Sequence, residues 1–133
     1  MIKPDGVARG LEKEILKRVE GRGLRVEEKK RIQVSVAQAA ELYEPHLGKP
    51  FYPGLLKFIT SGPVTACIIS GDNAIASLRE LMGATDPLVA AKGTIRGDLR
   101  ETNVINEDGT IKNLVHGSDS PESAAREIPI FFK

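Results

Sequence analysis

The sequence predicts a small sandwich of helices and strands, of the α+β or α/β class. Segments with strand-like and helix-like patterns intermix along its 133 residues, without internal repeats or low-complexity linkers. Residues 64–70 form a near-continuous apolar run of strand length, which indicates a central strand buried on both faces. A chain of this length is typical of one domain with a modest core, so we expect residues 1–133 to form a single domain.

The first third of the chain is expected to contain strand, helix and strand. Residues 1–3 have the pattern of a strand end, which the turn sequence Pro-Asp-Gly at 4–6 would terminate. Apolar residues then recur at helical spacing from 11 to 19, and two glycines follow as terminators. Alternating apolar residues at 32–36 predict a strand with one buried face, and the charged run at 27–31 is most simply a solvated strand or edge.

Helix-start signals predict two helices before the central strand. Ser35 and Gln38 form a capping-box pair in front of a short apolar-periodic segment. Pro53 suits the first position of a second helix, which the Gly-Pro pair at 62–63 ends. We therefore expect two short helices between residue 35 and the apolar run.

Beyond the central strand, one helix, a loop and a hairpin are expected. Asp72 or Asn73 caps the helix, and Gly83 ends it. Residues 84–98 contain turn-forming residues and are expected to be a loop. Residues 104–111 carry Asp-Gly between two apolar pairs, which predicts a hairpin.

The segment around His116 is the most informative stretch of the chain. Residues 114 and 115 predict a strand that ends at His116, one of two histidines. Ser120 can cap a final helix that begins at Pro121 and runs to about residue 128. A neutral imidazole beside a helix N-terminus can meet an anionic substrate and attack it. A histidine in this setting can equally be a structural residue. The other residues of the chain must therefore decide between a catalytic and a structural role.

Composition narrows the class of protein. The net charge is +1, with 19 basic and 18 acidic residues, so bulk charge offers no argument for nucleic-acid or membrane binding. The single cysteine, Cys67, excludes an intramolecular disulfide and is most simply a small buried residue. The sequence has no membrane-length apolar run and no signal-peptide pattern at its start. We expect a cytoplasmic protein.

Several catalytic classes have no support in the sequence. It contains no Walker-type phosphate loop and no kinase set of glycine loop and His-Arg-Asp. His46 and His116 are far apart in sequence and Cys67 is alone, so no metal-ligand spacing is present. A triad of His116, Ser118 and Asp119 is disfavoured because sequence neighbours rarely point at one another.

One histidine and several cations remain: Lys3, Arg79 and Arg96 lie in loops or near helix ends. Phosphoryl transfer needs little covalent chemistry from a protein, because positioning and charge neutralisation do most of the work. Arginine suits bidentate phosphate contacts, and a histidine nucleophile can divide the transfer into two steps. These residues therefore favour phosphoryl transfer.

Several blocks of the sequence, in this order, resemble the nucleoside diphosphate kinase family. They are Lys3-Pro4-Asp5-Gly6-Val7, Arg9-Gly10, Pro50-Phe51, Ser61-Gly62-Pro63-Val64, Gly93-Thr94-Ile95-Arg96-Gly97-Asp98 and residues 113–120. The match covers nearly the whole chain. The resemblance implies a ferredoxin-like α+β sandwich, in which helices cover a four-stranded antiparallel sheet.

The resemblance also implies catalytic roles. His116 would take the γ-phosphate from a nucleoside triphosphate and pass it to a diphosphate in a ping-pong reaction. Glu127 would bind the other imidazole nitrogen, and Lys3 and Tyr43 would lie near the transferred phosphate. Ser118 would satisfy a backbone group or bind Glu127. From the residues alone, Glu127 is most simply a solvated helix residue, and Tyr43 fits a core position as well as a site.

Nucleotide-binding roles follow in the same way. The resemblance places Arg79, Thr85 and Arg96 on the phosphates, Asn113 with Lys3 on the sugar, and Phe51 on the base with Leu55 beside it. Gly117 is included among the nucleotide-binding residues. Stacking accepts every base, so broad specificity is expected. Mg²⁺ would be bound through the nucleotide phosphates, with no protein ligand. From the residues alone, Phe51 and Leu55 suit a core, Arg79 a helix surface, Gly117 a tight turn and His46 a surface loop.

The sequence also allows a prediction about the protonation state of His116. His116 is predicted to be neutral at working pH. The helix start and the cations disfavour its protonated form, while Glu127 favours it.

Two departures from the family pattern are expected to matter. Either the sequence is trimmed within the first strand, or that strand is unusually short. The segment between Arg96 and Asn113 is longer than usual. Val104, Ile105 and Ile111 are the candidates for the apolar residue opposite Phe51. The leading hypothesis is a nucleoside diphosphate kinase that forms a homo-oligomer, a hexamer or a tetramer. A non-catalytic nucleotide-binding or interaction protein, and a phosphocarrier loaded by another protein, are the alternatives.

Overall fold

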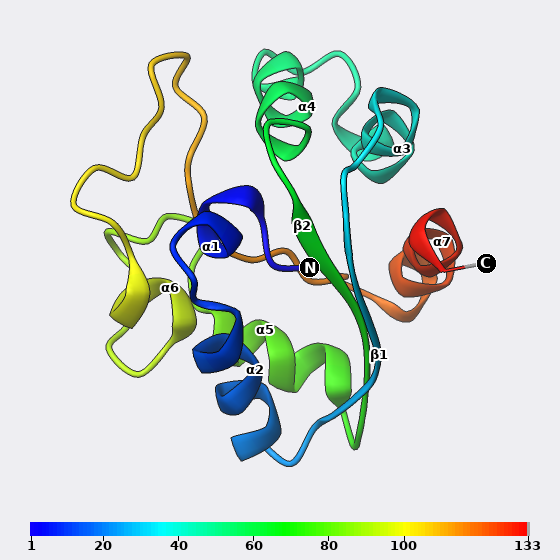
Figure 1. Ribbon diagram of the computed structural model, residues 1–133, viewed down its shortest axis with the longest axis vertical. Coiled ribbons are helices and arrows are strands. Elements are labelled where there is room, and N and C mark those ends of the chain that lie inside the picture. The colour runs from blue at the N-terminus through cyan, green and yellow to red at the C-terminus, as the bar shows by residue number, and fades with distance from the viewer. Residues whose placement is uncertain (133) are drawn as a thin grey trace.

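Helices pack on both sides of a short sheet in the computed structural model, which describes residues 1–132 (Figure 1). In chain order the elements are α1 (Pro4–Ala8), α2 (Glu12–Gly21), β1 (Arg25–Ile32), α3 (Val36–Leu42), the 3₁₀ helix η1 (Glu44–His46), α4 (Tyr52–Ile59), β2 (Val64–Ser70), α5 (Ala74–Met82), α6 (Ile95–Leu99) and α7 (Pro121–Phe131). This mixture confirms the α+β class. None of these helices is long and apolar enough to cross a lipid bilayer.

The sheet is smaller than predicted. Strands β1 and β2 pair antiparallel from end to end. On the other edge of β2, Ile2 forms one bridge to Thr65 and one to Val115. The predicted four-stranded sheet is therefore not confirmed, because residues 1–132 contain two strands and these isolated bridges.

Local backbone chemistry ends the extended segment at 1–3 and interrupts the one at 114–116. Pro4 begins α1 directly after Lys3, and proline has no N–H with which to continue a ladder. Leu114 has a φ of +71°, in the left-handed region, so the extended chain is interrupted just before Val115. An Asp5 carboxylate oxygen holds this conformation by accepting from the Leu114 N–H at 3.0 Å.

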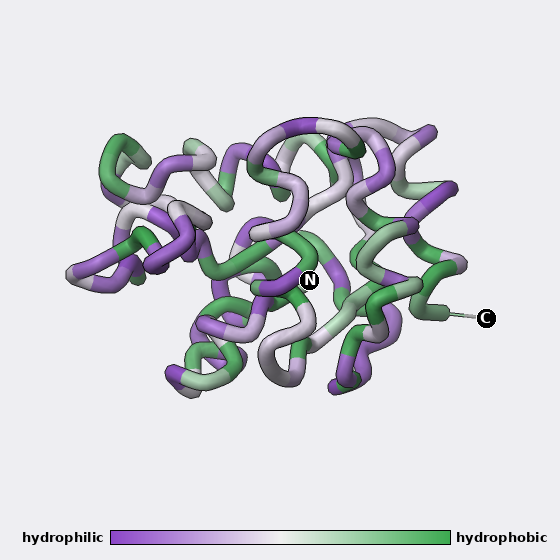
Figure 2. The backbone as a smooth tube through the Cα atoms, turned by 90° about the horizontal axis from the view of Figure 1, so that it is seen from above, coloured by the Kyte–Doolittle hydropathy of each residue, from purple (hydrophilic) through white to green (hydrophobic). Residues whose placement is uncertain are grey.

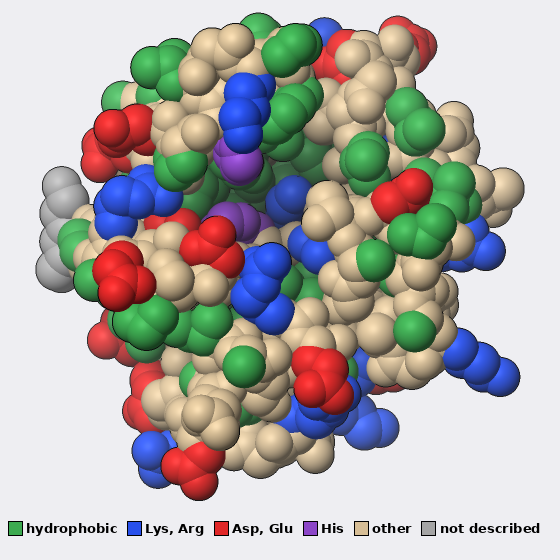
Figure 3. All heavy atoms as spheres, turned by 180° about the vertical axis from the view of Figure 1, so that it is seen from behind, with side chains coloured by type: hydrophobic (Ala, Val, Ile, Leu, Met, Phe, Trp, Pro, Cys, Tyr) green, Lys and Arg blue, Asp and Glu red, His purple; other side chains and the backbone are tan. Residues whose placement is uncertain are grey.

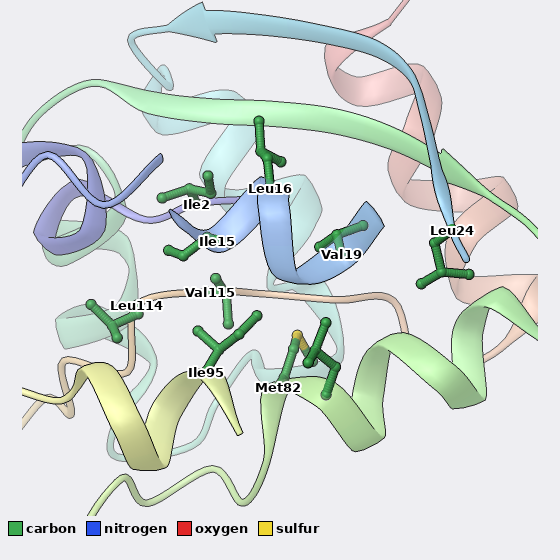
Figure 4. Close-up of a cluster of buried hydrophobic side chains, with 10 residues drawn as sticks. Ile2, Ile15, Leu16, Val19, Leu24, Met82, Ile95, Leu114 and Val115 are labelled. Atoms are coloured by element: carbon green, nitrogen blue, oxygen red, sulfur yellow. The ribbon is translucent and has the colours of Figure 1, made fainter. Parts of the chain in front are cut away.

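Two hydrophobic cores lie on opposite faces of β2. The first contains Ile2, Ile15, Leu16, Val19, Leu24, Leu81, Met82, Ile95, Leu114 and Val115, from α2, α5, α6 and the two extended segments (Figure 4). The second contains Val34, Ala39, Leu42, Tyr43, Ile59, Val64, Ala66, Ile130 and Phe131, from α3, α4, α7 and β2. Ala66 belongs to the second core, and Cys67 packs against the first. Because β2 is buried on both faces, its sequence is a nearly continuous run of apolar residues.

The outer helices are amphipathic. Along the tube in Figure 2, hydrophobic and hydrophilic residues alternate through the helices at the right of the view, as expected for helices that cover a core with one face. Ser35 forms the predicted capping box with Gln38, and Ser120 caps α7 by accepting from the Ser123 N–H. The predicted strand at 64–70 and hairpin at 104–111 are confirmed, the latter by a bridge between its two arms.

Three predictions about local structure were wrong. The predicted strand at 32–36 is wrong because β1 ends at Ile32 and the capping box at Ser35 starts α3, which leaves Val36 exposed; the solvated strand predicted at 27–31 is confirmed as part of β1. The predicted turn at 4–6 is helix α1. The predicted loop at 84–98 contains the start of α6, which Thr94 caps by accepting from the Gly97 N–H. In each case a start signal within four residues prevailed over the wider pattern.

Candidate active site

A cavity of about 550 Å³ opens between α3, α4, the hairpin and the segment that carries His116. Every site residue predicted from the sequence lines it except Ser118. Figure 3 shows a hollow with histidine side chains on its walls and lysine or arginine side chains around it. Residues from both ends of the chain therefore meet at one place.

His116 is held at the cavity wall by its backbone and by Glu127. The backbone of His116 exchanges two hydrogen bonds with Met1, at 2.7 and 2.8 Å. Glu127, on the inner face of α7, lies 2.7 Å from the His116 Nε2 through its Oε1. Ser118 also donates to this oxygen at 3.0 Å, so it acts on the site from outside the cavity.

The electrostatics of this pair decide which imidazole nitrogen is free. Burial lowers the pKa of His116 and outweighs the hydrogen bond to the Glu127 carboxylate, which would raise it. Burial would raise the pKa of Glu127, but the hydrogen bonds from His116 and Ser118 bring it below its usual value. Glu127 is therefore a carboxylate that only accepts, so a neutral His116 donates from Nε2 and keeps its lone pair on Nδ1. The lowered pKa agrees with the prediction that His116 is neutral. Its main cause is burial, rather than the helix start and the cations.

Arg126 is a cavity residue that sequence reasoning missed. Its guanidinium donates to the carbonyls of Glu41 at 2.6 Å and Leu42 at 3.4 Å, at the end of α3. It also lies 3.3 Å from the Glu127 Oε2, so the second carboxylate oxygen is occupied as well. No local signal marks this residue, because a helix neighbour of Glu127 would ordinarily face a different direction.

Lys3 and Asn113 are joined across the chain. The Lys3 Nζ donates to the Asn113 Oδ1 at 2.8 Å, and the Asn113 side-chain amide donates to the Thr85 carbonyl at 3.0 Å. Burial, with a further contribution from Arg96, lowers the pKa of Lys3 to about 8, while Asp5 opposes the shift. Lys3 is therefore a buried cation that begins to lose its charge just above neutral pH.

Arg96 is the most extensively bonded cation of the site. Its guanidinium donates to the carbonyls of Asn113 at 3.1 Å, Gly83 at 3.1 Å and Val115 at 2.7 Å. Burial, followed by the repulsion of Arg79, lowers its pKa to about 10, so the charge remains at neutral pH. Arg79 makes one long bond, of 3.4 Å, to the Gly117 carbonyl. The two arginines thus differ sharply in how firmly they are held.

Gly117 packs closely against the side chain of Met82 on α5. A Cβ at this position would lie 3.0 Å from both the Sδ and the Cε of Met82. The backbone therefore passes close to α5 beside His116, which supports the structural interpretation of this glycine.

Aromatic rings line the opposite wall. The Tyr43 ring lies 6.3 Å from the ring of His116 and 6.3 Å from that of His46, and His46 lies 5.3 Å from Phe51. Tyr43 belongs to both the second core and the cavity, and burial, followed by Glu127, raises its pKa, so its hydroxyl stays protonated. His46 is a cavity residue rather than the expected surface residue, and its Nδ1 is buried without a hydrogen-bond partner among residues 1–132.

The two ends of this wall differ in exposure. Phe51 is 50% exposed, so it is not a core residue. Leu55 is partly buried against the second core and also lines the cavity. Of the three candidates for the residue opposite Phe51, Ile111 lines the cavity, whereas Val104 is buried and Ile105 is half-exposed outside it.

A neutral imidazole with a free Nδ1, its carboxylate partner and four cations lie together in this cavity, an arrangement suited to a phosphate-handling site of the phosphotransferase class. Within residues 1–132, no group of three or more His, Cys, Asp or Glu side chains is arranged to hold a metal ion.

Comparisons with known proteins agree. A model of the nucleoside diphosphate kinase family matches residues 1–133. The nucleoside diphosphate kinase of Carboxydothermus hydrogenoformans is 54% identical over all of this chain and 85% of its own length. That of Thermus thermophilus is 50% identical over all of this chain and 92% of its own length. The chain belongs to the nucleoside diphosphate kinase family.

Solved structures show the same fold. A halophilic nucleoside diphosphate kinase from Halobacterium salinarum, in complex with CDP, superposes with a TM-score of 0.87 at 46% identity, over 99% of this chain and 84% of the other. A transition-state mimic of the enzyme from Borrelia burgdorferi, with bound vanadate and ADP, gives a TM-score of 0.91 at 37% identity, over 99% and 83%.

Proposed function

We propose that this protein transfers the γ-phosphate of a nucleoside triphosphate to a nucleoside diphosphate through a phosphohistidine at His116. The observation that carries the proposal is the His116–Glu127 pair, which leaves an unprotonated Nδ1 in a cavity with buried cations. Relatives of the same family bind CDP and a mimic of the transferred phosphoryl group with ADP, as their structures describe.

The reaction divides into two balanced steps. In the first, the Nδ1 lone pair forms a bond to the γ-phosphorus, and the bond from that phosphorus to the bridging oxygen breaks, releasing the diphosphate. In the second, a terminal oxygen of the acceptor diphosphate attacks the phosphohistidine and the P–N bond breaks. Glu127 supports the imidazole in both steps, because its carboxylate stabilises the positive charge that develops on the ring.

Cations and rings along the cavity position the nucleotide. Lys3, Arg79 and Arg96 neutralise the phosphates, with Thr85 and Tyr43 close to them, and Lys3 with Asn113 also reaches the sugar. Phe51 stacks on the base, with Leu55 beside it, and sequence-tolerant stacking makes base specificity broad. Gly117 provides the close backbone approach beside His116.

Mg²⁺ fits this chemistry as a partner of the phosphates. The carboxylate of Glu127 is engaged by three side chains, so the nucleotide's own phosphate oxygens would hold the ion. When bound, it would supply further neutralisation of the phosphate charge.

Labelling tests the proposal. The purified chain is incubated with γ-labelled ATP, quenched without acid and digested, and then GDP is added to a parallel sample. We expect acid-labile label on the peptide that contains His116, and its transfer to GDP. His116→Asn should abolish the label, whereas His46→Asn, the matched change at the other histidine, should retain it.

The outcomes separate the alternatives. A folded sample that binds CDP but never takes label would support the non-catalytic nucleotide-binding protein. Label from a phosphorylated donor protein, but not from ATP, would support the phosphocarrier.

We also propose that the chain forms one domain over residues 1–133, works in the cytoplasm and assembles as a homo-oligomer, a hexamer or a tetramer. Within residues 1–132, β1 pairs on one side only, and Leu88 and Val89 are exposed, so surface is available for assembly. Light scattering during size exclusion would contradict the assembly if it gave a single-chain mass of 14.4 kDa.

A further inference from the structure

The hairpin at residues 104–112 forms the far wall of the cavity. Its arms are joined by the Lys112 N–H to the Val104 carbonyl at 2.7 Å and by the Asn106 N–H to the Thr110 carbonyl at 2.8 Å. Val104 is 2% exposed and anchors the base of the hairpin, while Gly109, Thr110 and Ile111 line the cavity. The hairpin is therefore an ordered wall with a buried anchor.

One close contact joins this wall to α4. A Cβ added at Gly54 would lie closer than 3.0 Å to the Thr110 Oγ1 and 3.7 Å from the Thr110 Cβ. Thr110 is buried and β-branched, so its side chain has little freedom to turn away. Gly54 adopts an ordinary helical conformation, so its backbone does not require glycine. The absence of a side chain is needed only because Thr110 lies so close.

The contact lies beside residues that line the base end of the cavity. Gly54 is the third residue of α4, between the N-cap Phe51 and Leu55, and Thr110 directly precedes Ile111. Any shift of the hairpin away from α4 therefore changes the gap between Phe51 and Ile111. Residues at the phosphate end, such as Arg96 and His116, lie on other elements.

We propose that the contact of Gly54 with Thr110 determines the width of the base-binding end of the cavity, and thereby how tightly the base is held. The inference rests on the nucleotide-binding role proposed above. The pair is a positioning device, because neither residue needs to touch the reacting atoms.

A size exchange tests the inference. Dissociation constants of GDP, CDP and tripolyphosphate, which has no base, are measured by calorimetry for the unmodified chain, Gly54→Ala, Thr110→Ala and the double variant. Gly54→Ala should weaken GDP and CDP about fivefold or more, while tripolyphosphate changes less than about twofold. In the double variant, Thr110→Ala should reverse the effect of Gly54→Ala. The Cβ added at position 54 would then lie 3.7 Å from the Cβ at position 110, which is an ordinary van der Waals contact.

Stability provides an independent readout. Alanine is favoured over glycine inside a helix, so without the contact Gly54→Ala would raise the thermal midpoint and leave every dissociation constant unchanged. That result would overturn the inference. An equal loss of affinity for tripolyphosphate would overturn it too, because the effect would not be confined to the base end.

A second variant keeps the test decisive if Gly54→Ala does not fold. Thr110→Gly leaves α4 unchanged but removes the contact, and should weaken GDP and CDP about threefold without affecting tripolyphosphate. Thr110→Val retains the shape and should bind as the unmodified chain does. Failure of the unmodified chain to bind any nucleotide would instead count against the proposed function.

Discussion

The two ends of the cavity are built on different principles. At the phosphate end, Lys3, Arg96 and Asn113 are all buried, and each makes hydrogen bonds to residues distant in sequence. At the base end, Phe51 is half exposed, and the wall residues meet mainly through ring and apolar contacts.

This difference separates chemistry from recognition. Buried charges that hydrogen bonds hold in place need little reorganisation when a phosphate arrives, so their stabilisation is available at the moment of reaction. An open aromatic wall offers area without directional bonds, so it accepts bases of different shape. We expect substitutions at the first end to reduce the reaction rate and stability, and those at the second to change affinity alone.

The largest expected effect is that of Arg96→Gln. The carbonyls of Gly83, Asn113 and Val115 would lose their donor, so kcat/KM should fall by about 1000-fold and the free energy of unfolding by about 2–4 kcal/mol. The measurements are steady-state kinetics and urea denaturation. Arg79→Gln is the matched control: with one long bond, it should change the free energy of unfolding by less than about 0.5 kcal/mol. Equal destabilisation by both would contradict the comparison.

Glu127→Gln is expected to lower kcat by about 30- to 100-fold with little change in KM, because charge on the imidazole develops after the nucleotide binds. Since Glu127 raises the pKa of His116 against the effect of burial, the substitution should lower that pKa further. An NMR titration of the histidines measures it. An unchanged titration curve would show that the carboxylate does not act on the ring.

Phe51→Ala tests whether the base end of the cavity affects nucleotide affinity alone. Loss of stacking should raise the dissociation constants of ADP, GDP and CDP about tenfold, since a stacked base contributes about 1–3 kcal/mol. The affinity for tripolyphosphate should not change, and neither should kcat at saturation. A fall in kcat equal to that of Glu127→Gln would mean that the two ends are not separable.

The smallest expected effect is the pH dependence of ADP binding. Lys3 has a pKa of about 8, so its positive charge is present below pH 8 and is lost as the pH rises through that value. Arg96, with a pKa of about 10, remains charged up to pH 9. We expect the affinity for ADP to fall about fivefold between pH 7 and pH 9. Lys3→Met should bind more weakly throughout and show no such fall, and a parallel fall in this variant would assign the titration elsewhere.

Short-range signals determined much of what was predictable. The apolar run of β2 and the caps at Ser35 and Ser120 were confirmed because each depends on residues within one element. The same signals misplaced the strand near Val36, where a cap and an alternating pattern competed over the same few residues.

The sequence by itself determined the family and the α+β class, and it predicted most of the polar residues that the structure brings to the cavity. Only the tertiary structure decided that Lys3 bonds to Asn113, 110 residues away, and that Arg126 reaches back to the end of α3. It also placed His46 in the cavity and Thr110 against Gly54. The physical reason is range: caps and periodicity act over a few residues, whereas these contacts exist only once two cores have packed on opposite faces of β2.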